Sequence, residues 1–207
     1  MPLENRVDPF GTIHAAASRG LFTGNRGVIH DPATKTLLTR RWTTKAWIIC
    51  TLVHPRGRQR EPMGRNAPSG GAGWTELFFL DEVTALAAGH RPCFYCRREA
   101  ATSFQRCFAS ERASAPQMDA ALHHERMVGK LHLAATDIAA LPDAAMIAVR
   151  DRAFALRAGA AFPWSFAGYG RAQQLPDSAR LLTPVSTVEA LRRGYRPVWH
   201  GSLDVRG

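Results

Sequence analysis

The feature that most constrains this chain is a pair of cysteines separated by two residues, Cys93 and Cys96. A Cys-x-x-Cys segment that folds as a tight turn directs two thiolates at one metal ion, and a closed tetrahedral site needs two further donors. Upstream, Cys50 lies near the end of an apolar, β-branched segment, and His54 follows it at Cys-x-x-x-His spacing. We therefore predict one zinc ion per chain, bound by Cys50, His54, Cys93 and Cys96.

Alternatives to this ligand set stay open at the level of sequence. Redox proteins also use Cys-x-x-Cys pairs, but there the pair normally opens a helix after a strand. Here the pair follows a predicted helix, which disfavours a redox role. Cys107 is a competing ligand, although its place on a later predicted helix suits a small apolar residue. His54 is alternatively an exposed loop histidine.

Positive charge is the second constraint. The chain has 27 Lys and Arg against 17 Asp and Glu, a formal charge of +10. Lysine occurs only at Lys35, Lys45 and Lys130, so most basic groups are guanidiniums, whose planar fork suits phosphate. A GC-rich genome would favour arginine and alanine, but it would not create the positive excess. The excess favours a polyanionic partner.

Part of this charge lies beside the predicted metal ligands. Between residues 40 and 65, Glu61 is the only acidic residue. We predict that arginines after His54 and after Cys96 bind nucleic acid, with DNA favoured over RNA. These arginines are Arg56, Arg58, Arg60, Arg65, Arg97 and Arg98. The alternative is that they belong to a solvated loop whose charge serves solubility alone.

Apolar content and the N-terminal sequence bear on location. Hydrophobic residues make up 45% of the chain, enough for a core. The first residues show no apolar run behind a basic start, and no stretch approaches the ~20 apolar residues that span a bilayer. We expect a cytoplasmic protein with no signal peptide and no membrane partner; the oligomeric state is open.

The pattern of apolar and turn residues predicts an α+β fold. We expect a small, zinc-stabilised antiparallel sheet with short helices, followed by a C-terminal region that combines a β-hairpin with a helix. Residues 46–53 are the strongest strand because they are β-branched and aromatic. Asp81 and Ser186 are predicted N-caps, and Gly89 and Gly194 are predicted helix stops. Strands are predicted at 28–30, 36–40, 46–53, 76–79, 145–150, 153–157 and 180–183, and helices at 82–88, 99–108, 118–128 and 187–193.

Three regions follow from these elements. Residues 1–26 show little periodicity and are predicted to be an irregular N-terminal arm. Residues 27–110 form the predicted zinc domain, which includes a loop rich in proline, glycine and arginine at 55–73. Residues 117–207 form a second α+β region, either separate or continuous with the first, with a boundary near 110–117. An aromatic, turn-rich segment lies at 162–169.

Two segments echo each other. Residues 82–92 and 187–197 both read as a short helix, a glycine, an aromatic-type residue and Arg-Pro. Reuse of one helix-ending solution explains this better than duplication, because glycine accepts a positive φ and proline blocks continuation. The second copy has no cysteines and is not predicted to bind metal.

The segment that runs to Cys96 resembles a known family. Residues 82–96, Glu-Val-Thr-Ala-Leu-Ala-Ala-Gly-His-Arg-Pro-Cys-Phe-Tyr-Cys, are similar to the second metal motif in the N-terminal zinc domain of the Ada DNA methylphosphotriester repair family. Residues 48–54 have the Cys-x-x-x-Cys spacing of the first motif of that family, with His54 in the last place. The resemblance covers about residues 42–108.

The resemblance implies a zinc domain and a reactive cysteine. In Ada-like domains the first motif cysteine accepts a methyl group from a phosphotriester, a role that would fall to Cys50. Zinc keeps a thiolate deprotonated at neutral pH. This chain departs from the family pattern at His54, which lowers the negative charge of the site, and at Tyr95, where the family often has a basic residue.

Three classes of function are therefore consistent with the sequence. The first is a zinc-binding protein that binds nucleic acid or another polyanion through its arginines. The second is a stoichiometric methyl acceptor acting through Cys50, or an enzyme using a polar cluster of His123, His124, Glu125, Arg126, Lys130 and His132. The third is a structural or protein-interaction zinc module. A polar helix end is the simpler explanation of the histidine cluster.

Overall fold

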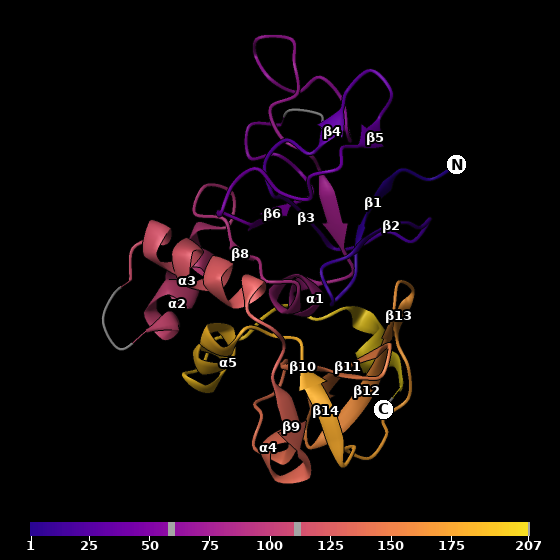
Figure 1. The fold of residues 1–207 in the computed structure, drawn as a ribbon, viewed down its shortest axis with the longest axis vertical. Helices are drawn as coiled ribbons and strands as arrows, with labels where there is room; N and C mark the ends of the chain where they lie inside the picture. The colour runs from indigo at the N-terminus through magenta and orange to yellow at the C-terminus, as the bar shows by residue number, and fades with distance from the viewer. Residues whose placement is uncertain (58–60, 110–112, 207) are drawn as a thin grey trace.

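The fold is α+β, as the sequence predicts, with two six-stranded sheets and five α-helices in the described residues. It is taken from a computed structural model that describes residues 1–57, 61–109 and 113–206. One sheet belongs to the N-terminal half and the other to the C-terminal half, and most of the helices lie between them or along one side (Figure 1).

The N-terminal sheet has the strand order β2-β1-β7-β3-β6-β8. It is mixed rather than purely antiparallel as predicted, because β1 pairs in parallel with β7, and β6 with β8. The strands are β1 (Glu4–Val7), β2 (Ile13–Ala15), β3 (Phe22–Asn25), β6 (Ile48–Thr51), β7 (Leu77–Phe79) and β8 (Arg91–Pro92). A separate hairpin, β4 (His30–Asp31) and β5 (Thr36–Leu37), turns where the Asp31-Pro32 signal predicts it.

The prediction of an irregular arm at residues 1–26 is wrong. That segment supplies β1, β2 and β3, which lie inside the sheet rather than outside the fold. The strands are only three or four residues long, so they carry too few alternations to be recognised locally. Their burial depends on distant partners; Arg6, for example, pairs with Phe78.

The C-terminal sheet is antiparallel throughout, in the order β13-β12-β11-β10-β14-β9. Its strands are β9 (His132–Ala134), β10 (Met146–Val149), β11 (Arg152–Arg157), β12 (Ala160–Ser165), β13 (Gly168–Tyr169) and β14 (Ser178–Leu181). The β10–β11 hairpin is confirmed, with Val149 opposite Arg152. The aromatic segment at 162–169 is not only turn, because it forms most of β12 and β13.

The helices are α1 (Glu82–Ala87), α2 (Arg98–Phe108), α3 (Ala115–Met127), α4 (Ala135–Ala139) and α5 (Val185–Arg192), with a 3₁₀ helix η1 (Gly201–Arg206) near the end. Asp81 is the N-cap of α1, as predicted, and accepts the Thr84 backbone N–H. Ser186 is not the N-cap of α5: Pro184 holds that position, and the Ser186 hydroxyl donates to Glu125 instead. β9 and α4 were not predicted.

The echo between residues 82–92 and 187–197 is a shared helix ending. Gly89 and Gly194 have φ of 82° and 101°, a region that favours glycine. The next residues, His90 and Tyr195, each donate a backbone N–H to the carbonyl five residues earlier, as in a Schellman motif. The similarity is thus explained by one capping geometry.

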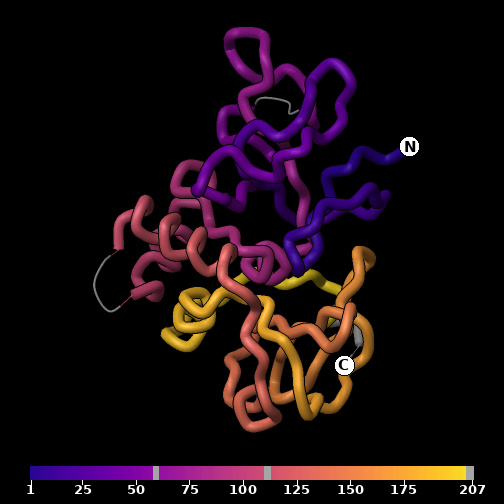
Figure 2. Tube along the Cα trace, in the orientation of Figure 1, coloured from indigo at the N-terminus to yellow at the C-terminus, as the bar shows by residue number. Residues whose placement is uncertain are grey.

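Packing continues across both halves. One hydrophobic cluster runs from Val7 and Phe79 in the N-terminal sheet to Met146 and Ala155 in the C-terminal sheet, with α1 and α5 contributing to it. A smaller cluster fills the C-terminal sheet around Ile147. After α5 the chain passes beside α1 before it reaches the C-terminus (Figure 2). In the described residues, no helix has both the length and the apolar character needed to cross a bilayer.

Candidate metal centre

Two parallel strands bring the cysteines together. β6 and β8 pair with Ile49 opposite Pro92, so the next residue along each strand is a cysteine, Cys50 and Cys93. The backbone N–H of Cys93 donates to the Ile49 carbonyl at 3.0 Å, which extends the pairing to the start of the turn. Ile49 is fully buried and packs in the core. Side chains alternate along a strand, so Cys50 faces away from Ile49 toward the turn.

The turn that follows β8 then brings the thiol of Cys96 close to that of Cys93. The backbone N–H of Tyr95 donates to the Cys93 sulfur at 3.4 Å. The backbone N–H of Arg97 donates to the Cys93 carbonyl at 2.9 Å and leads into α2. A thiolate has three lone pairs, so its sulfur can accept such an N–H hydrogen bond, which orients the ligand, and still bind a metal ion through another lone pair.

The result is a three-thiol cluster. The sulfurs of Cys50, Cys93 and Cys96 all lie within 4.8 Å of one another, and no disulfide joins them. Sulfurs bound to one zinc ion at about 2.3 Å are separated by slightly less than 4 Å, so these residues fit a metal with little rearrangement. Soft sulfur donors select zinc over the hard cations. The cluster can therefore hold a metal ion.

The thiols interact strongly with one another. The pKa of Cys93 is lowered, chiefly because Cys50 and Cys96 donate hydrogen bonds to its sulfur. The pKa of Cys50 is raised by the same contacts with Cys93 and Cys96 and by burial. For Cys96, the hydrogen bond with Cys50 lowers the pKa, but the contact with Cys93 and burial outweigh it and the pKa is raised. These opposite shifts show that the three sulfurs compete for the same protons, which a bound metal ion would displace.

Two buried ion pairs fix the chain on either side of the cysteine turn. Before it, Arg91 donates from Nε and Nη2 to the two carboxylate oxygens of Asp119 in α3, both at 2.8 Å. After it, Arg97 donates from Nη1 and Nη2 to the two carboxylate oxygens of Glu82 in α1, again at 2.8 Å. These four residues were not predicted to pair, because their partners are remote in sequence.

His54 lies beside the cluster but outside it. In the described residues, the group of ligand atoms that lie within 4.8 Å of one another contains the three cysteine sulfurs and neither ring nitrogen of His54. Its Nδ1 accepts the Arg56 backbone N–H at 3.1 Å, and its ring centroid lies 5.9 Å from that of Tyr95 in the cysteine turn. A fourth ligand at His54 stays a prediction.

Cys107 has the packing role that the sequence favours over a role as a metal ligand. It lies in α2, packs against the hydrophobic core, and its sulfur donates to the Arg193 carbonyl at 3.4 Å. It is not a member of the three-cysteine group. Cys50, the predicted methyl acceptor, is only 6% exposed, so its sulfur has little access to a large substrate.

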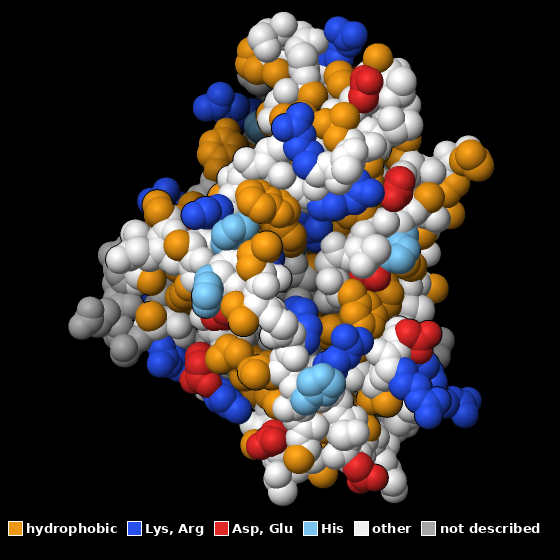
Figure 3. Space-filling model, in the orientation of Figure 1, with side chains coloured by type: hydrophobic (Ala, Val, Ile, Leu, Met, Phe, Trp, Pro, Cys, Tyr) orange, Lys and Arg blue, Asp and Glu red, His pale blue; other side chains and the backbone are white. Residues whose placement is uncertain are grey.

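The predicted nucleic-acid contacts separate into three groups. Arg56, Arg65 and Arg98 are exposed. Arg58 and Arg60 lie outside the described residues. The Arg97 side chain is 8% exposed and is bound to Glu82, so its assignment as a phosphate contact is corrected to that of a buried structural cation. Basic side chains also lie over both halves of the face in Figure 3, rather than in one patch.

The surface above the cysteines combines aromatic, apolar and basic groups. Tyr95 is 57% exposed, and Val53, three residues after Cys50, is 75% exposed. The guanidinium carbon of Arg56 lies 6.0 Å from the centre of the Tyr95 ring. Aromatic faces beside arginines are the groups that single-stranded nucleic acids contact.

Other candidates from the sequence have structural roles. Glu125 accepts hydrogen bonds from Ser186 and so joins α3 to α5. His132 lies in β9, whereas Glu125 lies in α3, so the polar cluster does not lie on one helix. Asp81 also accepts the Tyr169 hydroxyl at 2.8 Å.

Comparison of the chain with models of known protein families, with curated proteins and with solved structures gives no match.

Proposed function

We propose that this chain is a zinc-binding protein that binds nucleic acid through the surface beside its metal centre. The observation that carries the proposal is the three-cysteine cluster with Tyr95 and Arg56 exposed directly above it. The resemblance of residues 42–108 to the Ada zinc domain supports the same assignment.

We assign metal binding and nucleic-acid binding to different residues of this region. Cys50, Cys93 and Cys96 hold zinc, with His54 as the predicted fourth donor, and zinc supplies a fixed, redox-inert junction between β6 and the cysteine turn. Arg56, Arg65 and Arg98 neutralise phosphates, and the Tyr95 ring stacks on an unpaired base.

Methyl transfer is the weaker alternative. A methyl acceptor must expose its sulfur to a phosphotriester, whereas Cys50 lies between β3 and β8 and is the most buried of the three cysteines. A centre with three thiolates and one neutral donor also carries less negative charge than one with four, which lowers the nucleophilicity of each sulfur. We therefore assign Cys50 to metal binding.

The test combines metal analysis with binding. Purified protein should hold about one zinc ion per chain by mass spectrometry of the metal. Fluorescence anisotropy with labelled duplex DNA, single-stranded DNA and single-stranded RNA should show binding that weakens with salt. Replacing Arg56, Arg65 and Arg98 by glutamine should reduce the slope of log affinity against log salt by about 0.7–0.9 for each phosphate that is no longer neutralised.

The matched control replaces three exposed arginines of the C-terminal half, Arg152, Arg171 and Arg193, by glutamine. This control variant removes the same amount of positive charge but leaves the surface beside the metal centre unchanged. If both triple variants lose affinity equally, binding reflects net charge and the proposed surface is wrong. If the wild-type protein binds none of the three nucleic acids at low salt, the nucleic-acid role itself is wrong.

A further inference from the structure

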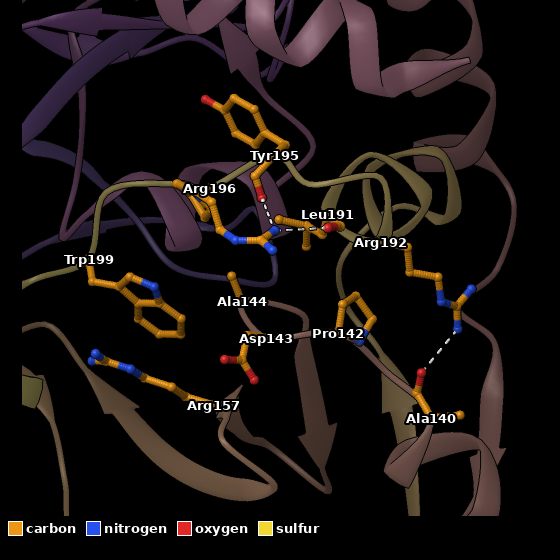
Figure 4. A pocket seen from close by; sticks show the side chains of 11 residues that line it. Ala140, Pro142, Asp143, Ala144, Arg157, Leu191, Arg192, Tyr195, Arg196 and Trp199 are labelled. Carbon is orange, nitrogen blue, oxygen red and sulfur yellow. Dashed lines mark hydrogen bonds between the residues drawn. The ribbon is translucent and has the colours of Figure 1, made fainter. Parts of the chain in front are cut away.

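A second candidate site lies in the C-terminal half and shares no residue with the metal centre. It is a cavity of about 590 Å³ between the segment before β10, the end of β11 and the segment that follows α5. A volume of this size falls within the range of roughly 300–1,000 Å³ that small-molecule sites occupy. Figure 4 shows its lining: Ala140, Pro142, Asp143, Ala144, Arg157, Leu191, Arg192, Tyr195, Arg196, Pro197 and Trp199.

The lining is positively charged. Three arginines, Arg157, Arg192 and Arg196, face one acidic residue, Asp143. Asp143 is itself engaged, since it accepts the Ala158 backbone N–H at 2.8 Å. The excess of guanidinium groups favours an anionic ligand over a neutral or cationic one.

Arg196 is the cation best placed to bind such a ligand. It is exposed, and its hydrogen bonds to the Leu191 and Tyr195 carbonyls, both 3.3 Å long, leave from Nη1 alone. A guanidinium has five N–H donors, so these two weak bonds orient Arg196 without using its fork. Arg192, in contrast, already pairs with Glu189 at 2.5 Å.

Trp199 adds a flat aromatic wall. Its ring centroid lies 5.7 Å from that of Tyr169 in an edge-to-face contact, and because Tyr169 is buried this contact helps to fix the orientation of the indole. The guanidinium carbon of Arg157 lies 5.6 Å from the same ring. In Figure 4 Trp199 and Arg157 lie at one end of the cavity and Arg192 at the other, with Asp143 and Arg196 between them; the Arg196 guanidinium points toward the Leu191 carbonyl.

We propose that this cavity binds a nucleotide, with the phosphate on Arg196 and the base against Trp199. Phosphate accounts for the cationic lining and a planar base accounts for the indole wall, whereas a simple anion would need only the first. The ligand is either a free nucleoside monophosphate or one nucleotide of a single strand. Two phosphate-binding places on one chain would also explain why positive charge is spread over both halves.

The experiment is calorimetric titration of the full, zinc-loaded chain with adenosine monophosphate, adenosine and inorganic phosphate, and with a short single-stranded oligonucleotide. We expect the monophosphate to bind more tightly than adenosine or phosphate alone. Arg196→Gln should weaken it by at least about tenfold, as expected for the removal of a charge-assisted hydrogen bond. Trp199→Leu should weaken it by about tenfold because the base can no longer stack.

The controls separate binding from folding. Arg193→Gln changes a neighbouring exposed arginine that does not line the cavity and should leave affinity unchanged. Trp199→Phe keeps an aromatic ring and should fold normally, with a smaller loss than Trp199→Leu. A free nucleotide is the ligand if the protein binds the monophosphate as tightly as the oligonucleotide or more tightly. A single strand is the ligand if the protein binds the oligonucleotide more tightly and Arg196→Gln weakens that binding. The proposal is overturned if the monophosphate does not bind, or if Arg196→Gln and Arg193→Gln behave alike.

Discussion

Replacement of Arg97 by alanine tests whether the residue after the cysteine turn serves the fold or a ligand. In the structure its guanidinium forms a bidentate pair with Glu82, whose side chain is 1% exposed. Glu82 also accepts hydrogen bonds from the Tyr195 hydroxyl and the Val198 backbone N–H. Arg97→Ala would leave this carboxylate buried with two neutral donors and no counter-charge.

The cost follows from that geometry. Removing one partner of a buried ion pair typically destabilises a protein by about 3–5 kcal/mol. The guanidinium of Arg97 also lies 4.3 Å from the centre of the Phe22 ring, and removing this cation–π interaction acts in the same direction. For a chain of 207 residues, each kcal/mol corresponds to roughly 2–4 °C in Tm, so the expected decrease is roughly 6–20 °C.

The assay is urea unfolding of the zinc-loaded protein, followed by circular dichroism. Arg98→Ala is the matched control, because Arg98 is the adjacent arginine and is exposed; it should change the free energy of unfolding by no more than about 0.5 kcal/mol. Adding Glu82→Gln to Arg97→Ala removes the unpaired buried charge and should recover part of the loss. Equal stabilities for Arg97→Ala and Arg98→Ala, together with a selective loss of nucleic-acid binding in Arg97→Ala, would refute the structural role.

Three further predictions concern the metal centre and the core beside it. Cys93→Ser should reduce bound zinc from about one ion per chain to near zero, whereas Cys107→Ser should retain it; release by Cys107→Ser in the measured metal content would contradict the ligand set. His54→Ala should lower the affinity for zinc at least about tenfold, measured in competition with a chelator. It should also change the visible spectrum of the cobalt-loaded protein, and an unchanged spectrum would exclude His54 as the fourth ligand. Burial, with Arg26 and Arg126 nearby, holds the pKa of His90 well below 6.5 in the folded state. The unfolded chain therefore binds a proton at His90 that the folded chain does not, so stability is lost as pH falls below about 6.5, by up to about 1.4 kcal/mol per pH unit. His90→Asn should flatten this slope in urea unfolding between pH 7 and pH 5, and an identical slope would show that other groups cause it.

Local signals in the sequence were sufficient for the elements around the cysteines. The β-branched run at 46–53 predicted β6, and the Asp81 cap with the Gly89 stop predicted α1, because both signals act within a few residues. Cys-x-x-Cys spacing likewise identified Cys93 and Cys96, and the strand before them pointed to Cys50. These three sulfurs are the ones that the structure brings together.

Long-range pairing explains what local signals missed. β1 lies in the sheet only because β7, some seventy residues later, is beside it. Arg97 had the sequence context of a surface arginine, since nothing near it in the chain shows that Glu82, fifteen residues earlier, faces it across the fold. Asp119 and Arg91 are separated by 28 residues and raised no signal at all. Charge next to a metal motif therefore does not by itself indicate a ligand-binding surface.

The Glu82 carboxylate joins the metal centre to the C-terminal half. On one side it binds Arg97, which directly follows the metal ligand Cys96. On the other side it accepts from Tyr195 and Val198, in the segment that also carries Trp199 of the second cavity. These donors share one buried carboxylate, so Arg97 and that segment belong to the same hydrogen-bond network, in which the loss of any one donor is costly. Cys96 is therefore one residue away from a polar network that runs from Arg97 through Glu82 to Tyr195, which lines the second cavity. The two proposed sites are distinct in chemistry but rest on one structural element, the first turn of α1.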